Sequence, residues 1–525
     1  MILNIRESKE LRGGLFSEGG INVKLAMIEN EFWFGGYVHE GDHQPIGEND
    51  NYSIDLRVNT SPNQSMPLFL STKGRYIWGE NGFRIAFEKG DIEIDGHVTI
   101  DEGFGNLKGA YLQAMKKHFP FKEIHLDLAL FNKPIYNSWI ELTFYQNEAD
   151  ILHYADSILE NGMPPGVLMI DDGWSDYYGE WVFSKGKFPN PKRMIQTLHD
   201  QGFHIMLWIS PYVTPDTTQF RELRDLDLLI KSPDNKPYIL EWWNGYSAVL
   251  DFSNPKTNEW MKKQLNNLLD MGIDGFKFDG GDSRYYATDN LTYGNVTPEE
   301  QSQLWTKFGE DYDFNEFRFT TKAGGMSLLQ RLADKDHSWG RGGISSLVPH
   351  SLLQGITGHP FCSPDMIGGG QYLNFIDLED GAFDQELFVR HSEIACLMPA
   401  MQFSASPYRV LNESAFDKVL KTLDIRKKYQ NTIEQLVMRA KEDGEPIIRY
   451  MTYEFPDEPV EKVTDQFMLG TDVLVAPATE KNMQTRKVYL PKGNWTYNGQ
   501  VIASQGEYHT FPCPMGTLII LEKSS

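Results

Sequence analysis

The sequence predicts an α/β protein in which buried parallel strands, arranged as a (β/α)8 barrel or as a doubly wound sheet, lie between two antiparallel β domains. Three observations predict this order. Short alternating apolar stretches, broken by Gly, Asn and Asp, dominate the first 135 residues. Continuous apolar runs then alternate with amphipathic stretches, as buried parallel strands and their covering helices do. Strand-like segments return from about residue 444.

The length of 525 residues exceeds what one hydrophobic core supports, so several domains are expected. We predict an N-terminal antiparallel β-sandwich over residues 1–135, a barrel domain over 136–443 and a C-terminal β domain over 444–525. Within the barrel domain, the polar and turn-rich segment at about 283–316 predicts a loop excursion over the barrel mouth.

The apolar runs of the central part end in polar residues. These runs are GVLMIDD (166–172), GFHIMLWISP (202–211), AVLDFSNP (248–255) and GIDGFKFDGGD (272–282). Barrels and doubly wound sheets both carry their sites at the carboxyl ends of strands, so the runs predict a site without choosing the fold. No GxGxxG or GxxxxGK[ST] motif follows any of them, which disfavours nucleotide binding.

Charge and composition exclude several classes of partner. The net charge of −24 argues against nucleic acid and anionic membrane surfaces, which recruit basic patches. The three cysteines, Cys362, Cys396 and Cys513, form no CxxC pair, and no other spacing requires a metal or cofactor. The charged N-terminus is not a signal peptide and no apolar run spans a membrane, which favours a cytoplasmic protein. A periplasmic or secreted chain whose signal was removed would look the same.

The sharpest local feature is the segment KFDGGD (277–282). Alternation along a strand places Lys277 and Asp279 on the same side. A nearby ammonium keeps a carboxylate ionised, as a nucleophile requires. A salt bridge that only stabilises the strand end explains these residues equally well.

Glycoside cleavage would need a second carboxylate, because one attacks the anomeric carbon while the other protonates the leaving oxygen. The segment RLADKDHSW (331–339) offers Asp334 and Asp336, which the residues alone do not rank. Either one is also compatible with a surface charge. The isolated His337 and His350 are interpreted as structural residues.

An ordered set of segments resembles glycoside hydrolase family 31 over nearly the whole chain. FKFDGGD is similar to the nucleophile segment of that family, and Asp334-x-x-x-Ser338-Trp339 is similar to its acid/base segment, although Ala333 stands where a Gly is usual. The resemblance implies a (β/α)8 TIM barrel. It also implies a retaining mechanism with Asp279 as the nucleophile and Asp334 as the general acid/base.

Two further segments carry the resemblance. Arg318 precedes Asp334 by sixteen residues, the spacing of a substrate-binding Arg in the family. GHPFCSPDMIGGG (358–370) resembles the next family segment, whose Asp corresponds to Asp365. Other segments, WWNGYSAVLDFSNP (242–255) and MPAMQFS (398–404) among them, are similar to the subgroup that contains the myogenesis-regulating glycosidase, whose implied substrates are α-galactosides.

The expected substrate is an oligosaccharide or small α-glycoside, with galactose favoured over glucose and xylose. Gln402-Phe403-Ser404 stands where α-glucosidases of the family carry Arg-x-His, and IDDGW (170–174) resembles a sugar-binding segment of related α-galactosidases. Strand alternation leaves open whether one or both carboxylates of that segment face the sugar. The substrate-binding candidates are Asp171, Asp172, Trp181, Trp208, Trp243, Lys277, Asp282, Arg318, Trp339 and Asp365.

The alternatives are an α-glucosidase, an α-xylosidase or a transglycosylase of the same family. A non-catalytic carbohydrate-binding protein and a barrel enzyme with Lys277 as a Schiff base are rivals from other classes. A homo-oligomer is compatible with the sequence, which does not decide it.

Overall fold

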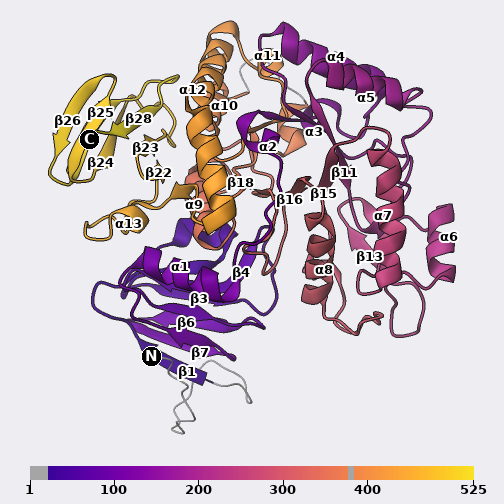
Figure 1. The fold of residues 1–525 in the computed structure, drawn as a ribbon, viewed down its shortest axis with the longest axis horizontal. Helices are drawn as coiled ribbons and strands as arrows, with labels where there is room; N and C mark the ends of the chain where they lie inside the picture. The colour runs from indigo at the N-terminus through magenta and orange to yellow at the C-terminus, as the bar shows by residue number, and fades with distance from the viewer. Residues whose placement is uncertain (1–21, 377–382, 525) are drawn as a thin grey trace.

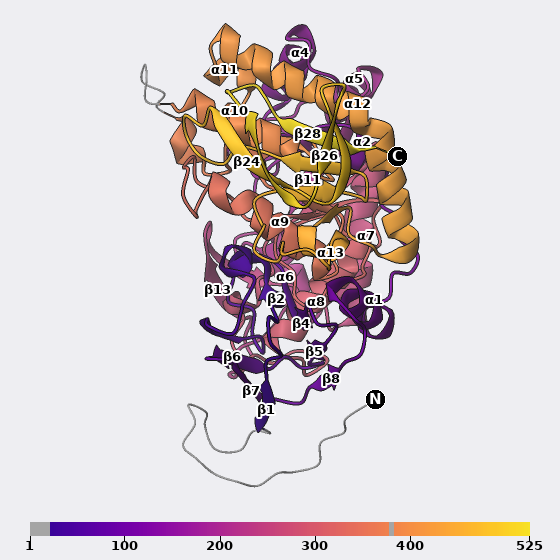
Figure 2. The same cartoon turned by 90° about the vertical axis from the view of Figure 1, so that its left-hand side faces the viewer.

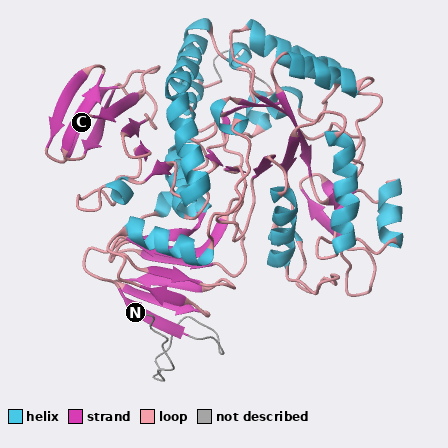
Figure 3. Ribbon diagram, viewed as in Figure 1, coloured by secondary structure: helices cyan, strands magenta, loops and turns pink. Residues whose placement is uncertain are grey.

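The computed structural model describes residues 22–376 and 383–524, so the N-terminal segment considered above as a signal peptide lies outside the described residues. Two strand-rich regions flank a central region of parallel strands and helices (Figures 1 and 3). In Figure 1 the long helix α12 (Glu413–Asp443) lies between the central region and the C-terminal strands, and the turned view shows these strands in front of the central region (Figure 2).

The N-terminal region consists of two four-stranded antiparallel sheets. The first has the order β1 (Asn22–Ala26), β7 (Asp91–Asp95), β6 (Arg84–Glu88) and β3 (Asn51–Asp55). The second has the order β2 (Trp33–Tyr37), β4 (Ser65–Ser71), β5 (Tyr76–Trp78) and β8 (Thr99–Asp101). Alternate apolar residues of both sheets, such as Ile85, Ile94 and Phe69, form one shared core, which is the arrangement of a β-sandwich.

The second sheet is buried on both faces. Phe69 and Ile77 belong to the sandwich core, whereas Leu68 and Leu70 belong to the main core of the molecule. All seven residues of β4 are therefore buried, and helix α1 (Leu107–His118) packs on this sheet. This double burial joins the sandwich firmly to the central region.

The central sheet is parallel and closes into a barrel. Its order is β18 (Cys362–Ser363), β17 (Gln330–Arg331), β16 (Phe314–Phe317), β15 (Gly275–Phe278), β11 (His204–Ile209), β10 (Val167–Ile170), β9 (Ile135–Asn137), β20 (Gln402–Phe403) and β19 (Met366–Ile367). The two strands at the ends of this order, β18 and β19, are separated in the chain only by Pro364 and Asp365. They are the halves of one interrupted strand, so the ring has eight positions and the predicted (β/α)8 barrel is confirmed.

Helices follow most barrel strands along the chain. They include α4 (Glu148–Glu160), α5 (Pro191–Asp200), α7 (Pro255–Leu269), α8 (Pro298–Glu310), α9 (Leu347–Ile356), α10 (Gln385–Ala395) and α12. Within the described residues, the connection from β16 to β17 carries no helix. There the sandwich docks instead, because Ser65 of β4 bridges Thr321 in a parallel register.

Two expectations about the barrel need correction. The segment 283–316 is not a loop excursion, because it contains helix α8 and the start of barrel strand β16. The capping box of Thr297 and Glu300, with Pro298 at the first helical position, marks the start of this helix in the sequence. The run AVLDF is not a parallel barrel strand either, because β14 (Gly245–Val249) pairs antiparallel with its neighbours.

The strand β14 belongs to a small sheet inserted between β11 and α7. It lies between β12 (Tyr212–Val213) and β13 (Ile239–Trp242), with helix α6 (Thr218–Asp225) in the same connection. Val249 is buried against aromatic rings of the insertion, whereas Ala248 and Leu250 belong to the main core that includes the barrel strands. The run is therefore as buried as a barrel strand, and hydrophobicity alone did not distinguish the two locations.

The C-terminal region is an antiparallel β domain. Its larger sheet has the order β21 (Ile448–Arg449), β22 (Phe467–Leu469), β23 (Val473–Ala476), β28 (Ile519–Lys523), β25 (Gly493–Tyr497) and β26 (Gln500–Ser504). A second sheet pairs β24 (Thr485–Leu490) with β27 (Glu507–Pro512). None of the helices in the described ranges has the length and apolar character to cross a membrane.

Candidate active site

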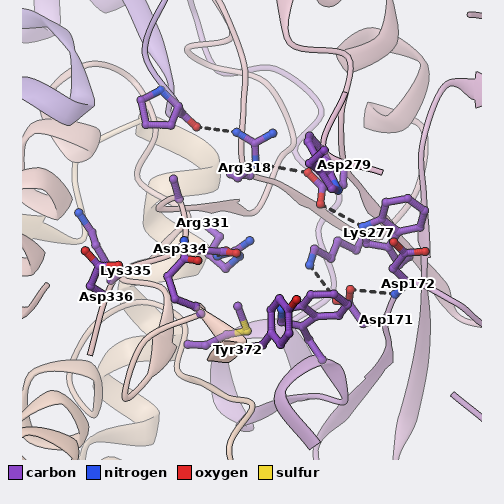
Figure 4. A pocket seen from close by; sticks show the side chains of 18 of the residues that line it. Asp171, Asp172, Lys277, Asp279, Arg318, Arg331, Asp334, Lys335, Asp336 and Tyr372 are labelled. Carbon is purple, nitrogen blue, oxygen red and sulfur yellow. Dashed lines mark hydrogen bonds and ion pairs between the residues drawn. The ribbon is translucent and has the colours of Figure 1, made fainter. Parts of the chain in front are cut away.

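A cavity of about 680 Å³ opens at the carboxyl ends of the barrel strands. Most of its charged side chains come from the carboxyl ends of strands β10, β15, β16 and β17 or from the residues that follow them, and they point toward one another (Figure 4). The lining includes eight residues predicted from the sequence, namely Asp171, Asp172, Trp208, Trp243, Lys277, Asp279, Arg318 and Asp334.

Asp279 follows β15 directly and is held at both carboxylate oxygens. Arg318 Nε donates to Oδ1 at 3.3 Å, and the indole N–H of Trp208 donates to Oδ2 at 3.0 Å. The backbone N–H of Gly280 also donates to Oδ1, at 2.9 Å. Burial would raise the pKa of Asp279, but Arg318, Lys277 and Trp208 together lower it below its usual range. Asp279 is therefore an oriented carboxylate that stays ionised.

Asp334 reaches the same cavity from the loop after β17. Its Oδ1 accepts a hydrogen bond from Arg331 Nη1 at 2.9 Å, and its side chain is 34% exposed, against 12% for Asp279. The cavity side of Asp334 is thus open to a ligand. Gly370 packs beneath it, since a Cβ atom there would lie 2.8 Å from the carboxyl carbon of Asp334.

Arg331 is a fully buried cation between carboxylates. Its Nη1 lies 2.5 Å from Asp365 Oδ1, and its Nε lies 3.2 Å from Glu316 Oε1. Burial lowers the pKa of the guanidinium, but Asp334, Asp365 and Glu316 raise it well above its ordinary value. The charge of Arg331 compensates the buried acids and fixes the direction of the Asp334 side chain.

Both carboxylates of the IDDGW segment line the cavity. The strand β10 ends at Ile170, so the alternation that would point neighbours to opposite faces no longer applies at Asp171 and Asp172. Lys277 Nζ pairs with Asp171 Oδ2 at 2.8 Å rather than directly with Asp279. Burial lowers the pKa of Lys277, yet Asp171 raises it above its usual value, so the ammonium stays charged.

Asp172 has a different environment from that of Asp279. Its Oδ2 accepts hydrogen bonds from Tyr178 Oη at 3.0 Å and from Asn244 Nδ2 at 2.7 Å, both of which are neutral donors. Burial and the adjacent Asp171 raise the pKa of Asp172 to about 7. Its buried Oδ1 has no protein partner, which leaves one acceptor unsatisfied beside the cavity.

Two tryptophans form aromatic walls. Trp208 lies on β11, and its ring is stacked on Trp242 with centroids 6.4 Å apart. Trp243 is 46% exposed at the opening, and the guanidinium carbon of Arg318 lies 5.6 Å from its ring centroid. An aromatic face of this kind packs against the C–H face of a sugar.

Two family models match this chain. The one described as "Glycosyl hydrolases family 31 TIM-barrel domain" matches residues 129–325, and the one described as "Glycosyl hydrolase family 31 C-terminal domain" matches residues 444–522. The chain belongs to glycoside hydrolase family 31. The resemblance inferred from FKFDGGD and the segments that follow it is thereby confirmed.

Known relatives support the family and the fold. The myogenesis-regulating glycosidase of Mus musculus is 34% identical over 385 residues, which cover 71% of this chain and 53% of that protein. Alpha-xylosidase XylQ of Lactiplantibacillus pentosus is 24% identical over 458 residues, which cover 82% of this chain and 58% of that protein. The chain thus spans little more than half the length of these two relatives.

Among solved structures, the Flavobacterium johnsoniae GH31 dextranase complexed with glucose superposes with a TM-score of 0.82. The sequence identity is 20%, and the match covers 97% of this chain and 67% of that one. At this identity the likeness shows the family 31 fold alone.

Four predicted substrate-binding residues of this family 31 chain lie outside the cavity lining. Trp181 is buried and packs its ring on Trp260, with centroids 5.7 Å apart. Trp339 donates its indole N–H to Asp384 at 2.8 Å. Asp282 and Asp365 are fully buried behind the site, where they pair with Arg318 at 2.7 Å and with Arg331 at 2.5 Å.

Several residues of the lining were not predicted from the sequence. Arg331 was quoted only as part of a motif, although its position three residues before a candidate acid is a usable signal. Asn244 belongs to the inserted sheet, and His39 and Pro62 come from the N-terminal sandwich. No local pattern connects these positions with the barrel. Asp336, the alternative candidate for the second carboxylate, also lines the cavity. The remaining lining residues are Trp139, Phe144, Arg284, Ala333, Lys335, Met366 and Tyr372, with Gly342, Gly370 and Gln371.

Proposed function

We propose that this protein is a retaining, exo-acting α-glycosidase, most specifically an α-galactosidase. One observation carries the proposal: Asp279, held ionised by Arg318, Lys277 and Trp208, lines the same strand-end cavity as the more exposed Asp334. Two carboxylates with unequal environments are what double displacement at a sugar requires.

In the proposed reaction, Asp279 attacks the anomeric carbon and forms a covalent glycosyl-enzyme. Asp334 gives its proton to the departing glycosidic oxygen. In the second step, Asp334 takes a proton from water, which attacks the anomeric carbon and releases Asp279. The cation-like transition state is stabilised by the surrounding carboxylates. Arg318 and Lys277 keep the free carboxylate of Asp279 deprotonated before it attacks and after it is released.

The preference for galactose rests on the paired acids that follow β10. Asp171 and Asp172 both line the cavity, and their oxygens accept hydrogen bonds from sugar hydroxyl groups with strong directional preference. The position at which family α-glucosidases carry Arg-x-His is occupied by buried residues here, and Gln402 donates to Glu316 at 2.6 Å. This side chain is therefore engaged within the barrel instead of being free to hold glucose.

An α-xylosidase or an α-glucosidase is the second candidate, because relatives bearing these names match most of this chain. A transglycosylase would use the same covalent intermediate with a sugar acceptor in place of water. A Schiff-base mechanism at Lys277 is disfavoured, because the pairing with Asp171 keeps the amine protonated.

The test is hydrolysis of matched aryl α-galactoside, α-glucoside and α-xyloside, with Asp279→Ala as the control. We expect the fastest release from the galactoside and its loss in the variant, with the α-anomer of the sugar appearing first by NMR. Preference for another sugar would overturn the galactose assignment but not the mechanism. Unchanged turnover in Asp279→Ala would overturn the mechanism, and no release from any substrate would favour a carbohydrate-binding protein.

A further inference from the structure

A loop of the N-terminal sandwich contacts the barrel on either side of the active-site arginines. The carbonyl of Pro62 accepts from Arg318 Nη1 at 2.8 Å. Gln64 Nε2 donates to the carbonyls of Arg318, at 2.7 Å, and Arg331, at 3.0 Å. The residue between them, Asn63, accepts a hydrogen bond at its Oδ1 from the backbone N–H of Ala333, at 2.5 Å. Ala333 immediately precedes Asp334.

The loop is held rigid before it meets the barrel. Asn59 Nδ2 donates to the carbonyl of Asn63 at 2.9 Å, and Ser61 Oγ donates to Asn59 Oδ1 at 2.7 Å. Asn59 and Asn63 are fully buried. On the barrel side, Gln354 of α9 donates to Gln64 Oε1 at 2.9 Å. The acceptor offered to Ala333 is thus a fixed point rather than a mobile side chain.

A second contact reaches the residue after Asp334. Lys335 is buried, and its Nζ donates to Ser346 Oγ at 2.8 Å and to His350 Nδ1 at 3.0 Å. The other ring nitrogen of His350 lies 3.0 Å from Oδ1 of Asp42, which belongs to η1 (Val38–His43) of the sandwich. Because Nδ1 accepts from Lys335, Nε2 carries the proton that Asp42 accepts.

We propose that Asn63 and Asp42 are positioning residues, through which the N-terminal sandwich holds the general acid/base loop from both sides. The inference rests on the proposed function, since it assigns Asp334 the acid/base role. Arg331 and Gly370 locate the Asp334 side chain from below. Asn63 positions the backbone at Ala333, and Asp42 acts through His350 on the side chain of Lys335.

The expected consequence is selective. Release of a poor leaving group needs a proton from Asp334, whereas a dinitrophenolate leaves without one. Displacement of Asp334 therefore slows only the first kind of substrate. A loss of fold stability, by contrast, lowers the amount of active enzyme and slows the hydrolysis of both substrates alike.

The experiment measures kcat/KM of Asn63→Ala and Asp42→Ala on phenyl and dinitrophenyl glycosides of the sugar that the wild-type protein cleaves. We expect kcat/KM to fall about 10-fold on the phenyl glycoside and to change little on the dinitrophenyl glycoside. The expected fall is a part of the ~10²–10⁴-fold rate enhancement that general acid catalysis supplies. The ratio of the two values does not depend on how much of a variant is folded, so a destabilised variant still gives an answer.

Gln44→Ala is the matched control. Its side chain donates to the carbonyl of Gly35 at 2.7 Å and accepts from the N–H of Gly35 at 2.8 Å, so both hydrogen bonds lie within the sandwich. It should leave the ratio unchanged, and Asp334→Ala should show the selective loss in larger form. Equal losses on both substrates in Asn63→Ala and Asp42→Ala would overturn the inference alone. Inactivity of the wild-type protein on the aryl α-galactoside, α-glucoside and α-xyloside alike would overturn the proposed function, and the inference with it.

Discussion

Two buried carboxylates in one cavity have opposite pKa shifts, and their neighbours explain why. Burial raises the pKa of both Asp279 and Asp172. Asp279 faces Arg318 and Lys277, whose charges outweigh burial, whereas Asp172 faces Asp171 and two neutral donors. Asp279 is thus kept ionised, whereas the pKa of Asp172 lies near neutral pH.

The raised pKa of Asp172 predicts a pH-dependent gain in stability for Asp172→Asn. Between about pH 4, where the unfolded Asp titrates, and about pH 7, the folded protein binds the proton more tightly. The stability of the wild-type protein therefore falls as pH rises through this window, and the full cost remains above it. We expect the variant to be more stable at pH 8 by a few kcal/mol, and the gain to shrink toward pH 4.

Thermal melting at pH 8, 6 and 4.5 measures this difference. Asp216→Asn, at an exposed position, is the control and should melt like the wild-type protein at each pH. A difference for Asp172→Asn that is the same at all three pH values would contradict the prediction. Hydrolysis should fall in this variant at the same time, because stability is gained where the proposed substrate contact is lost.

At the scale of elements, the inserted sheet completes the cavity wall. The strands β13 and β14 are joined by a two-residue turn, Trp243 and Asn244, and Gly245 follows with φ +99°. This backbone conformation favours glycine, and it turns the hairpin so that both turn residues line the cavity. The hairpin thereby brings Asn244 to the carboxylate of Asp172, which follows β10 and lies 72 residues earlier in the chain.

The hairpin predicts a binding defect for Asn244→Ala. The change removes the 2.7 Å hydrogen bond from Asn244 to Asp172. In the described part of the chain, Tyr178 is then the one side chain that still donates to the Asp172 carboxylate. A hydrogen bond to a charged group contributes about 1.5–3 kcal/mol, so we expect KM to rise about 10-fold with a smaller change in kcat. Steady-state kinetics of the cleaved aryl glycoside measure both. Tyr246→Ala, on the exposed side of β14, is the control, and an unchanged KM in Asn244→Ala would contradict the prediction.

At the scale of the whole molecule, burial extends without a break from the sandwich sheet through the barrel to helix α12. Cys362 and Cys396 lie inside this interior, Cys513 lies in the separate core of the C-terminal domain, and all three are unpaired. Burial raises the pKa of the Cys362 thiol to about 12 and also raises the pKa of Cys396 and Cys513. Only the thiolate reacts readily with a disulfide reagent.

The burial of the thiols predicts that a thiol reagent titrates none of them in the folded protein and all three after unfolding. The reaction with Ellman's reagent, with and without guanidinium chloride, counts them. Reducing agent should leave the melting temperature unchanged. Fast reaction of even one thiol under native conditions would show that the interior around that cysteine opens readily.

The sequence by itself determined the features that repeat locally or carry a motif. Apolar runs such as GVLMI predicted β10, and the segments around Asp279 and Asp334 predicted the family. These features can be predicted because strand burial and motif chemistry both depend on residues that are consecutive in the chain.

Only the tertiary structure decided which distant segments meet. AVLDF is as apolar as a barrel strand, and its place in the inserted sheet depends on partners that it finds after folding. Asn63 and Ala333 are 270 residues apart, and Lys277 pairs with Asp171 across 106 residues. The cavity that holds Asp279 and Asp334 is thus a product of barrel closure and sandwich docking, because hydrogen bonds and charge pairs across such separations leave no periodic trace in the sequence.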